Sequence, residues 1–339
     1  MQNTQAIVVE GGFGLDRLKI IERDEGRPGP GQIAIELRAA SLNYRDYLLV
    51  TGSYNPRQKL PIVPLSDGVG EITEVGEGVR GLVKGDRVCP LFAQGYLAGE
   101  PTREKLSTTL GSPLDGVLRK RMVLSAESVV PVPSSMSDVE AATLPCAALT
   151  AWSALVEQGG LMPGQTVLVQ GTGGVSIFAL QIAKALGARV MVTSKSDAKL
   201  ERARGLGADH GINYGTTPAW GKEAAKWSGE GCDVVVEVGG AGTLAESIKA
   251  VRNGGRIAII GMLASSAAEV NVVPVLMRNL RLQGVFVGHK EAMMRMVAAF
   301  AATKIAPVID TVMPWVEARA ALERMAKGDH FGKIVLRFD

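Results

Sequence analysis

The pattern of apolar and polar positions changes partway along the chain. Up to about residue 130, short β-like runs such as 33–38, 70–75 and 86–92 are separated by Gly, Pro and Asp turns. Runs of this kind are typical of an all-β barrel or sandwich. From about residue 138, strand-like apolar runs alternate with segments of helical spacing, which predicts a doubly wound parallel sheet of about six strands.

Individual elements follow from this second pattern. We predict strands at 166–170, 189–193, 210–214, 233–238, 256–261 and 280–287, helices over 148–158 and 292–302 with another beginning at Gly174, and a short terminal element at 330–337. The polar segment 93–119, punctuated by Gly and Pro, is predicted to be a long surface loop. The fold class is therefore α/β, with a β-rich domain at 1–130, a nucleotide-binding domain at 131–286 and a C-terminal segment at 287–339.

A glycine-rich turn joins the strand at 166–170 to its helix. Gly171 permits a tight turn, Gly173 lets backbone N–H groups approach phosphates, and the helix directs its positive end at them. Ser176 replaces the third glycine of the usual fingerprint, so the motif depends on its strand–helix–strand context. We expect a dinucleotide site here, the alternative being glycines that serve packing alone. The binding residues expected in the turn are Gly171, Thr172, Gly173, Gly174 and Val175.

The end of the next strand indicates which dinucleotide is bound. Chains that select NAD place Asp or Glu there, about 20 residues after the first glycine. Here Ser194 and Lys195 take that place, and Lys199 follows one turn into the next helix. These groups can donate to a 2′-phosphate and neutralise it, which favours NADP(H). The alternative is that both lysines are ordinary solvated charges at a helix start.

The amino-acid composition indicates which broad class of protein this is. The 339 residues are 46% hydrophobic and 21% charged, with a net charge of +3 and no basic block, so we expect a soluble globular protein without a nucleic-acid partner. The first ten residues lack the features of a secretory signal, and the uncharged stretch 158–183 is too rich in Gly, Gln and Pro for a membrane span. Three dispersed cysteines fit a reducing cytoplasm.

Over nearly its full length the chain resembles the medium-chain dehydrogenase/reductase superfamily, which contains zinc alcohol dehydrogenases and zinc-free quinone oxidoreductases. Besides the glycine turn, the segments that carry the resemblance are 41–46, 65–71, 79–88, 144–152, 207–214, 237–240 and 330–333. The resemblance implies a GroES-like barrel, a Rossmann domain and a C-terminal segment that returns to the barrel. It also implies an active-site cleft between the two domains.

The chain departs from the zinc members of that family at their metal ligands. Asn43 stands at the first Cys position and Ser66-Asp67 at the His-Glu pair, so that only Cys146 keeps its residue type. One thiol with Asn and Ser makes a poor tetrahedral zinc site, and 93–119 lacks the cysteines of a structural zinc lobe. We therefore expect no zinc. Cys146 is expected to be a small buried residue, with a reactive thiol as the alternative.

Without a metal, hydrogen-bond donors must stabilise the negative charge that forms on a substrate oxygen as hydride arrives. The resemblance implies that Asn43 and Tyr54 line the cleft and supply these donors. The alternatives are a turn residue for Asn43 and an aromatic at the pocket rim for Tyr54. Asp46 is expected to be a structural acceptor near a cation, and Ser66-Asp67 can equally form a tight turn.

Further cofactor contacts are implied by the same resemblance. They are expected from Tyr44, Thr150, Tyr214, Gly261, Met262, Leu263, Val287, Gly288, His289 and Lys290. Together these assignments predict a zinc-independent, NADPH-dependent reductase of a quinone or an α,β-unsaturated carbonyl. The alternatives are an alcohol dehydrogenase or ketone reductase, or a non-catalytic NADPH-binding protein. We also expect a homodimer, because an apolar strand at 280–287 would be a costly bare edge.

Overall fold

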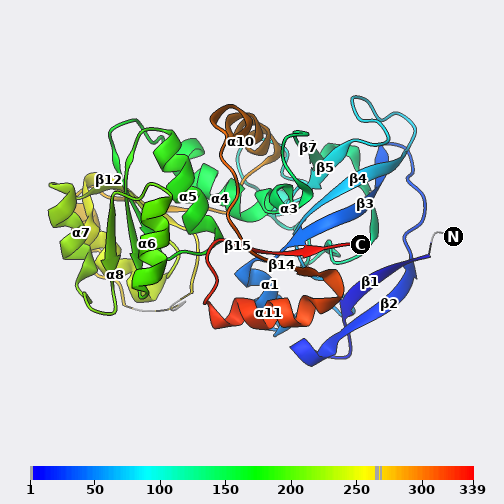
Figure 1. The fold of residues 1–339 in the computed structure, drawn as a ribbon, viewed down its shortest axis with the longest axis horizontal. Coiled ribbons are helices and arrows are strands. Elements are labelled where there is room, and N and C mark those ends of the chain that lie inside the picture. Colours follow the sequence, from blue (N-terminus) through cyan, green and yellow to red (C-terminus); the bar gives the residue numbers. More distant parts are fainter. Residues whose placement is uncertain (1–2, 264–266, 268) are drawn as a thin grey trace. The chain divides into compact units, whose positions relative to one another are not determined.

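The computed structural model describes residues 3–263, 267 and 269–339. The chain forms two compact units (Figure 1). Unit 1 comprises Met1–Leu149 and Gly288–Asp339, and unit 2 comprises Thr150–Val287. The C-terminal segment thus rejoins the N-terminal part of the chain. The segment 131–149, which the sequence pattern placed with the nucleotide domain, lies in unit 1. There the short helix α3 (Asp138–Ala141) packs on the strands β3 (Gln32–Ser41) and β4 (Asp67–Val75).

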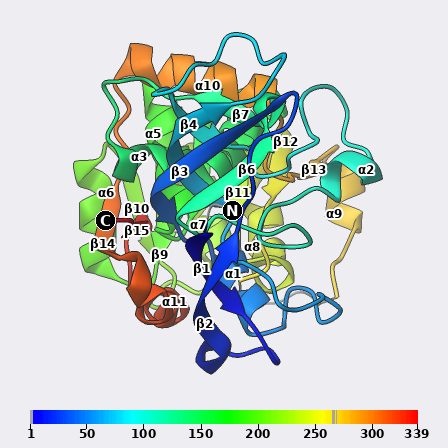
Figure 2. The ribbon, with the colours of Figure 1, turned by 90° about the vertical axis from the view of Figure 1, so that its right-hand side faces the viewer.

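Unit 1 is built on a seven-stranded sheet and a separate hairpin, in keeping with its predicted β character (Figure 2). Its strands are β1 (Asn3–Val9), β2 (Leu18–Asp24), β3 (Gln32–Ser41), β4 (Asp67–Val75), β5 (Arg87–Pro90), β6 (Arg121–Ser125), β7 (Val129–Pro131), β14 (Ile309–Pro314) and β15 (Lys333–Arg337). Strands β1 and β2 pair with each other, and the sheet runs β14-β15-β3-β4-β5-β7 with β6 also on β3. Apolar side chains of β3 alternate into a core around Ile33, Ile35 and Leu37.

The helices of unit 1 are mostly short. They are α1 (Tyr44–Val50), α2 (Arg103–Leu106), α3 (Asp138–Ala141), α10 (Lys290–Thr303) and α11 (Ala318–Lys327), with 3-10 turns η1 (Leu15–Arg17), η2 (Ala126–Ser128) and η5 (Trp315–Glu317). A π-helical turn, η3 (Leu144–Ala148), leads into α4 (Leu149–Trp152), and a second, η4 (Ser153–Glu157), follows it. The helix predicted over 148–158 therefore begins earlier, at Leu144, and is wound partly as π-helix.

Strand pairing in unit 1 brings distant polar residues together. Antiparallel pairing sets Val335 of β15 opposite Ser41 of β3. Counting outward from that pair, Lys333 comes opposite Asn43, just where the chain leaves β3 and enters α1. Asp67 is the first residue of β4, which lies on the other side of β3 and pairs with Ser41. The three polar side chains thus converge at one end of the sheet.

The segment 93–119 is not the surface loop that its composition predicted. Ala93, Tyr96, Leu110, Val117 and Leu118 are all buried. Exposed residues are concentrated around α2, where Thr102 caps the helix by accepting from the Lys105 N–H. Single apolar residues that are buried in the core are separated by polar residues along this segment. Its average composition is therefore polar, although these apolar residues are buried.

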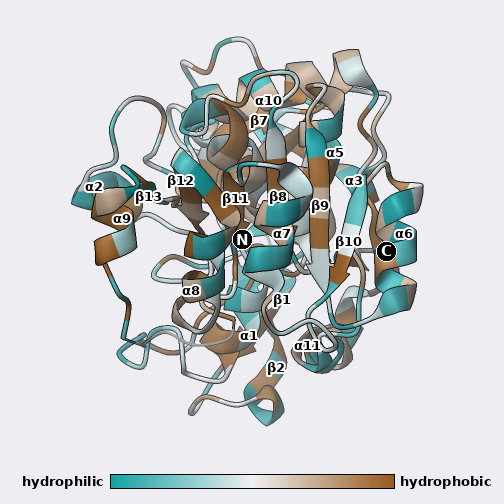
Figure 3. Cartoon of the chain, turned by 90° about the vertical axis from the view of Figure 1, so that its left-hand side faces the viewer, coloured by the Kyte–Doolittle hydropathy of each residue, from teal (hydrophilic) through white to brown (hydrophobic). Residues whose placement is uncertain are grey.

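Unit 2 is the predicted doubly wound parallel sheet, with six strands in the order β10-β9-β8-β11-β12-β13. The strands are β8 (Thr166–Gln170), β9 (Arg189–Ser194), β10 (His210–Asn213), β11 (Cys232–Glu237), β12 (Val251–Ile259) and β13 (Arg281–Gly284). The helices are α5 (Gly174–Ala185), α6 (Asp197–Gly205), α7 (Trp220–Ser228), α8 (Ala241–Ala250) and α9 (Val273–Met277). Figure 3 shows apolar residues along β9 and β11 and polar ones on the outer faces of α6 and α7.

The edge strand β13 is shorter than predicted. It ends at Gly284, whereas the apolar pattern extended to 287. Val285 and Val287 are buried beyond the end of the strand. The Val285 N–H still donates to the Ile259 carbonyl of β12 at 2.9 Å, but Val287 has a left-handed φ of 48°, which an extended strand excludes.

The helices of the described residues include none with both the length and the apolar character needed to cross a bilayer.

Candidate active site

The nucleotide turn, residues 171–175, follows β8 in unit 2. Gly171 has a φ of 71°, and a Cβ added at Gly171 or Gly173 would meet no atom within 4 Å. The glycines therefore do not serve packing against this chain, and they leave open space beside the backbone. The N–H groups of Gly174, Val175 and Ser176 have no acceptor among the described residues. Unpaired N–H groups at the start of a helix suit an anion, so these residues fit the pyrophosphate of a dinucleotide.

The polar residues expected to select the cofactor lie beside that turn, because β9 and β10 are the next strands of the sheet. Ser194 is buried, and its Oγ accepts from the Ser196 N–H at 3.2 Å, which leaves its hydroxyl proton free to donate. The backbone N–H of Tyr214 donates to the Ser194 carbonyl at 3.1 Å. Lys195 is exposed, and the structure gives it no ion pair with any residue it describes.

The acidic residue that follows Ser194 and Lys195 in the chain is Asp197, and its side chain binds Asn213. Asp197 opens α6, and its Oδ1 accepts from Asn213 Nδ2 at 2.9 Å. Its charge also suits the positive N-terminus of that helix. Lys199 lies one turn further on, with its backbone N–H capped by Ser196. Ser194 ends β9 and Lys195 and Lys199 follow it, while the one carboxylate between the two lysines accepts from Asn213.

A buried carboxylate, which the sequence analysis did not single out, orders the neighbouring strand ends. Glu237 at the end of β11 is fully buried, and its Oε1 accepts from Gly239 N–H, Gly240 N–H and Thr243 Oγ1. Its Oε2 accepts from Gln170 Nε2 at 2.8 Å and from Ser247 Oγ. Gln170 is the last residue of β8, so this network ties the nucleotide turn to the loop after β11.

The remaining residues expected near the nicotinamide follow β12 and β13. A Cβ at Gly261 would lie 2.6 Å from the Val238 carbonyl oxygen, so only glycine fits this close approach. The Leu263 N–H donates to the same oxygen at 3.2 Å. Met262 and Leu263 are 65% and 55% exposed, large values for apolar side chains beside a strand end. Thr150, the first residue of unit 2 along the chain, is buried.

Unit 1 holds a cluster of five side chains, which we call the Lys333 cluster. Ser66, Asp67 and Lys333 are buried, and Asn43 and Cys146 are half-buried. Lys333 Nζ donates to Asn43 Oδ1 at 2.7 Å and to the Leu42 carbonyl at 2.6 Å. Asp67 accepts at Oδ1 from Ser66 Oγ at 2.8 Å and at Oδ2 from the Cys146 N–H at 3.1 Å. Ser66 and Asp67 are fully buried and Asp67 begins β4, so they are not the tight turn considered from the sequence.

Burial dominates the electrostatics of this cluster. It raises the pKa of Asp67, and the nearby Lys333 ammonium opposes that rise. It lowers the pKa of Lys333, again with Asp67 as the main opposing charge. Burial also raises the pKa of the Cys146 thiol well above its usual range. The thiol on its own therefore stays protonated at neutral pH, which disfavours a reactive nucleophile.

Asp46 lies next to this cluster at the start of α1. Its Oδ2 accepts from the Asn43 N–H at 2.8 Å, and Arg45 Nη1 is 3.6 Å from its Oδ1. It thus has the acceptor position near a cation that the sequence suggested. Burial nevertheless raises its pKa from 3.8 to about 6, because Arg45 only partly offsets the loss of solvent.

The Lys333 cluster does not fit a tetrahedral zinc ion. Lys333 Nζ already occupies Asn43 Oδ1, and an ammonium at that oxygen would repel a second cation. The Ser66 hydroxyl is already engaged, since it donates to Asp67 Oδ1 at 2.8 Å. No group of three potential His, Cys, Asp or Glu ligands occurs among residues 3–263, 267 and 269–339.

Asn43 has one polar atom left over. Its Oδ1 must accept from Lys333, since an ammonium can only donate, and this fixes the amide orientation. Asn43 Nδ2 lies near enough to Asp67 to help lower that group's pKa. Yet this buried nitrogen completes no hydrogen bond with any described residue. An unsatisfied donor of this kind costs about 1–3 kcal/mol, so this nitrogen calls for a partner such as an ordered water or a ligand.

Tyr54 lies at the surface of unit 1 and is 41% exposed. The Arg45 guanidinium packs over its ring at 4.9 Å and over the Phe92 ring at 4.8 Å. Arg45 is itself held by a 2.9 Å bond from Nη1 to the Leu110 carbonyl. The Tyr54 hydroxyl has no hydrogen-bond partner within the described part of the chain. Its ring is thus fixed while its hydroxyl is available.

Four of the expected cofactor residues belong to unit 1. Tyr44 packs against the core and lies 5.9 Å from the Tyr47 ring. Gly288 begins the returning segment. His289 caps α10 by accepting from the Ala292 N–H at 3.1 Å, and Lys290 Nζ donates to the Glu127 carbonyl at 2.7 Å. Both side chains therefore have structural contacts within unit 1. Val287 is the last residue of unit 2.

Sequence reasoning missed Lys333 and Glu237 as individual residues. Both lie in segments that carried the family resemblance, 330–333 and 237–240. The available signal was a charged residue at the edge of an otherwise apolar run, where burial requires a partner.

Comparisons with known proteins agree with this architecture. Residues 29–134 match the alcohol dehydrogenase GroES-like domain, and residues 174–302 match the zinc-binding dehydrogenase family. A zinc-type alcohol dehydrogenase-like protein of Schizosaccharomyces pombe is 45% identical over 334 residues, covering 96% of each chain. The acryloyl-coenzyme A reductase of Metallosphaera sedula is 34% identical over 347 residues, covering 98% of this chain and 99% of the relative.

Solved structures show the same relationship. The structure of a putative alcohol dehydrogenase from Sinorhizobium meliloti superimposes with a TM-score of 0.92 at 40% identity, over 100% of this chain and 99% of that one. The GroES-like and Rossmann folds predicted from the sequence are thereby confirmed. With its nucleotide turn, the chain is an alcohol dehydrogenase-like oxidoreductase that binds a nicotinamide dinucleotide, and it belongs to the medium-chain dehydrogenase/reductase superfamily.

Proposed function

We propose that this protein is a zinc-independent, NADPH-dependent reductase of α,β-unsaturated carbonyl compounds or quinones. The observation that carries the proposal is the Asn43 amide, oriented by Lys333 and left with a buried, unsatisfied Nδ2–H donor. Such a preorganised donor supports a reaction in which negative charge develops on an oxygen. Reduction of an activated double bond is such a reaction, since hydride adds to the β-carbon, the π electrons move to the carbonyl oxygen, and a solvent proton then completes the α-carbon.

In this proposal the residues of unit 1 act on the substrate oxygen. Asn43 Nδ2 and the Tyr54 hydroxyl donate hydrogen bonds to it, and these bonds strengthen as the enolate forms. Lys333 keeps the amide in the donating orientation and supplies positive charge within the cluster. Arg45 holds the Tyr54 ring in place. The name of the acryloyl-coenzyme A reductase relative supports an α,β-unsaturated acyl group as one substrate class.

The residues of unit 2 hold the cofactor, which supplies the hydride when bound. The open backbone of the nucleotide turn accommodates the pyrophosphate, and Ser194, Lys195 and Lys199 favour a 2′-phosphate. We therefore assign NADP(H) as the preferred form. This preference has its own test, a comparison of kcat/KM with NADPH and NADH, and the assignment fails if NADH is preferred.

Substrate class is tested by NADPH consumption with matched enones, quinones and saturated ketones. The proposal expects turnover of enones or quinones, unaffected by chelator, and less than one zinc per chain by elemental analysis. Ketone reduction with one tightly held zinc per chain would instead indicate a zinc alcohol dehydrogenase, the activity in the name of the Schizosaccharomyces pombe relative.

The role of Asn43 is tested by Asn43→Asp, which keeps the shape and the acceptor for Lys333 but replaces the NH2 donor with an oxygen. We expect kcat to fall by about 10²- to 10³-fold. Denaturant unfolding of the same variant measures the cost of placing the new carboxylate near Asp67. The matched control is Asn271→Asp, at an exposed position whose side chain only accepts from the Val273 N–H. Unchanged kcat in Asn43→Asp would contradict the donor role.

A further inference from the structure

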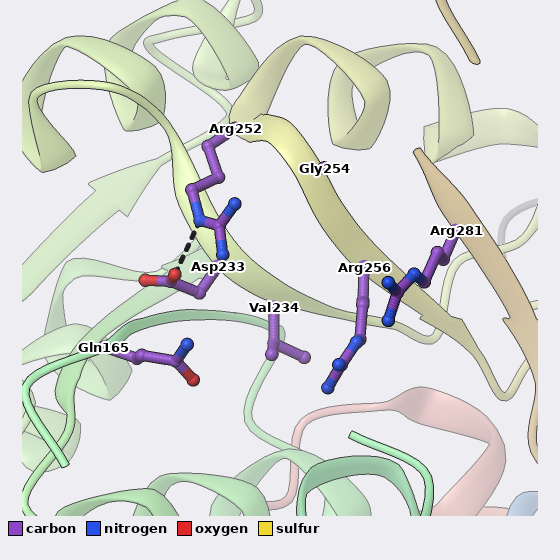
Figure 4. Close-up of a pocket in the computed structure, with 7 residues that line it drawn as sticks. All are labelled: Gln165, Asp233, Val234, Arg252, Gly254, Arg256 and Arg281. Atoms are coloured by element: carbon purple, nitrogen blue, oxygen red, sulfur yellow. Dashed lines mark hydrogen bonds and ion pairs between the residues drawn. The ribbon is translucent and has the colours of Figure 1, made fainter. Parts of the chain in front are cut away.

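A second cationic site lies in unit 2, away from the nucleotide turn. A cavity of about 140 Å³ is lined by Gln165, Asp233, Val234, Arg252, Gly254, Arg256 and Arg281 (Figure 4). We call it the arginine pocket. Gln165 precedes β8, Asp233 is the second residue of β11 and Arg281 is the first of β13. The pocket therefore opens at the amino-terminal edge of the sheet, while the nucleotide turn follows the carboxyl end of β8, roughly 15 Å away by strand rise.

The charges in this pocket do not balance. Arg252 Nε donates to Asp233 Oδ1 at 2.6 Å, and the other oxygen of Asp233 accepts from the Thr166 N–H at 2.7 Å. Asp233 is therefore fully used by Arg252 and the backbone. Arg256 and Arg281 have no ion pair or hydrogen bond with any residue that the structure describes. Since arginine stays charged at all physiological pH values, the pocket keeps two uncompensated positive charges.

Strand pairing forces those two charges together. Arg256 of β12 and Arg281 of β13 are direct partners in the parallel register. Their side chains must leave the sheet on the same face, and like charges placed directly opposite each other are destabilising. Arg256 is half-buried and Arg281 is exposed, and a Cβ at Gly160 would lie 3.2 Å from Arg256 Nη1. The repulsion is therefore felt most by Arg256. An anion between the two groups would remove the repulsion.

The neutral side chain of Gln165 can also donate a hydrogen bond to an anion in the pocket. Gln165 Oε1 accepts from the Met162 N–H at 2.9 Å, which leaves the Gln165 amide nitrogen as a free donor. Two guanidinium forks and an amide match the oxygens of a tetrahedral oxyanion, which arginine binds through paired N–H groups. A volume of 140 Å³ compares with about 30 Å³ for one water molecule and about 300–1,000 Å³ for typical small-molecule pockets. It suits one anionic group and excludes a whole nucleotide.

We propose that the arginine pocket binds a phosphate group, either free inorganic phosphate or the phosphoryl end of a small metabolite. The site is separate from the nucleotide turn and does not depend on the proposed reductase activity. Binding there stabilises unit 2 by neutralising the Arg256–Arg281 pair.

The test measures thermal unfolding with inorganic phosphate as the probe. Sodium phosphate replaces sodium chloride at constant ionic strength, and saturating NADPH is present so that the nucleotide turn is already filled. Wild type is compared with Arg256→Gln and Arg281→Gln. Arg80→Gln removes an exposed charge in unit 1 and serves as the matched control.

We expect phosphate to raise Tm by about 2 °C or more in wild type and in the control, but not in either pocket variant. In chloride alone, Arg281→Gln should be at least as stable as wild type, because the repulsion is gone. Glycerol 3-phosphate in a parallel series separates the two sources, since a metabolite site would respond to the ester at lower concentration than to inorganic phosphate.

Two results would overturn the proposal. One is an equal response to phosphate in wild type and both pocket variants, which would place phosphate elsewhere. The other is that the pocket variants sediment differently from wild type but respond to phosphate as wild type does. That result would assign Arg256 and Arg281 to a contact between copies of the chain along the edge strand β13.

Discussion

The nucleotide turn in unit 2 and the Lys333 cluster in unit 1 hold their expected ligands by different means. The turn offers unpaired backbone N–H groups beside glycines that leave open space. The cluster offers side chains that are buried, charged and bonded to one another, with a single unsatisfied donor at Asn43 Nδ2. A backbone site tolerates changes in the side chains around it, whereas a side-chain cluster depends on every member. Substitutions should therefore cost more in unit 1 than in unit 2.

The largest effect is expected from Lys333→Met. This change removes the buried ammonium, leaves Asp67 without its main opposing charge, and takes the donor from Leu42 O and Asn43 Oδ1. Breaking one side of a buried charge arrangement costs about 3–5 kcal/mol, so the free energy of unfolding in denaturant should fall by that amount. Lys327→Met, at the exposed end of α11, should change stability by less than about 0.5 kcal/mol.

A second variant shows whether the stability lost in Lys333→Met is due to the unpaired charge of Asp67. Adding Asp67→Asn to Lys333→Met removes the uncompensated charge and should recover part of the lost stability. If the double variant is no more stable than Lys333→Met alone, then Lys333 acts mainly through its hydrogen bonds.

The next effect concerns Tyr54 and separates chemistry from packing within unit 1. Tyr54→Phe keeps the ring under Arg45 and removes only a hydroxyl that has no partner among the described residues. If that hydroxyl donates to the substrate oxygen, kcat should fall by at most about 10²- to 10³-fold with KM little changed. Asn43 can take over part of the role, which would reduce the loss.

Steady-state kinetics with a quinone and an enone decide the matter. Tyr54→Ala is the companion variant, because it removes the ring as well. Unchanged kcat in Tyr54→Phe together with a raised KM in Tyr54→Ala would make Tyr54 an aromatic that only shapes the pocket, and would leave Asn43 as the donor.

The same contrast explains what the sequence could predict. The glycine turn, the strands around it and the start of α5 at Gly174 were correctly placed, because backbone sites depend on local spacing. The Lys333 cluster could not be assembled, since it joins residues 290 positions apart through the pairing of β15 with β3. The buried anchors in 93–119 were missed for a related reason, because single apolar residues gain meaning only once a core exists.

Asp46 provides a pH-dependent comparison. Its pKa of about 6 in the folded chain exceeds the ordinary value of 3.8, so the native state holds the proton more tightly than the unfolded chain between these values. Wild-type stability from this group is therefore present below about pH 3.8 and is lost as pH rises to about 6. Asp46→Asn keeps an acceptor for the Asn43 N–H, and because its side chain does not titrate, it does not lose this stability as the pH rises.

We expect Asp46→Asn to gain stability relative to wild type by about 1.4 kcal/mol for each pH unit in that window, and to gain no more above it. Denaturant unfolding between pH 4 and 8 measures the difference. Asp16→Asn, at an exposed position, is the matched control for the loss of a carboxylate. A flat profile for Asp46→Asn would mean that Arg45 and Lys333 fully offset the burial of Asp46.

The smallest effect is expected in unit 2, at Ser194, because there a side chain only tunes a site that the backbone forms. Ser194→Asp places a carboxylate where the 2′-phosphate is expected, while the new side chain can still accept from the Ser196 N–H. Loss of the hydroxyl donor and the added repulsion together amount to about 1.5–3 kcal/mol, so KM for NADPH should rise by roughly tenfold or more and NADH should be used better. Ser228→Asp, at the C-terminal end of α7, is a control for added charge. The free energy of unfolding should change much less than in Lys333→Met, because the nucleotide turn itself is untouched.

Equal use of NADPH and NADH by wild type, with no change in Ser194→Asp, would show that the end of β9 does not select the cofactor.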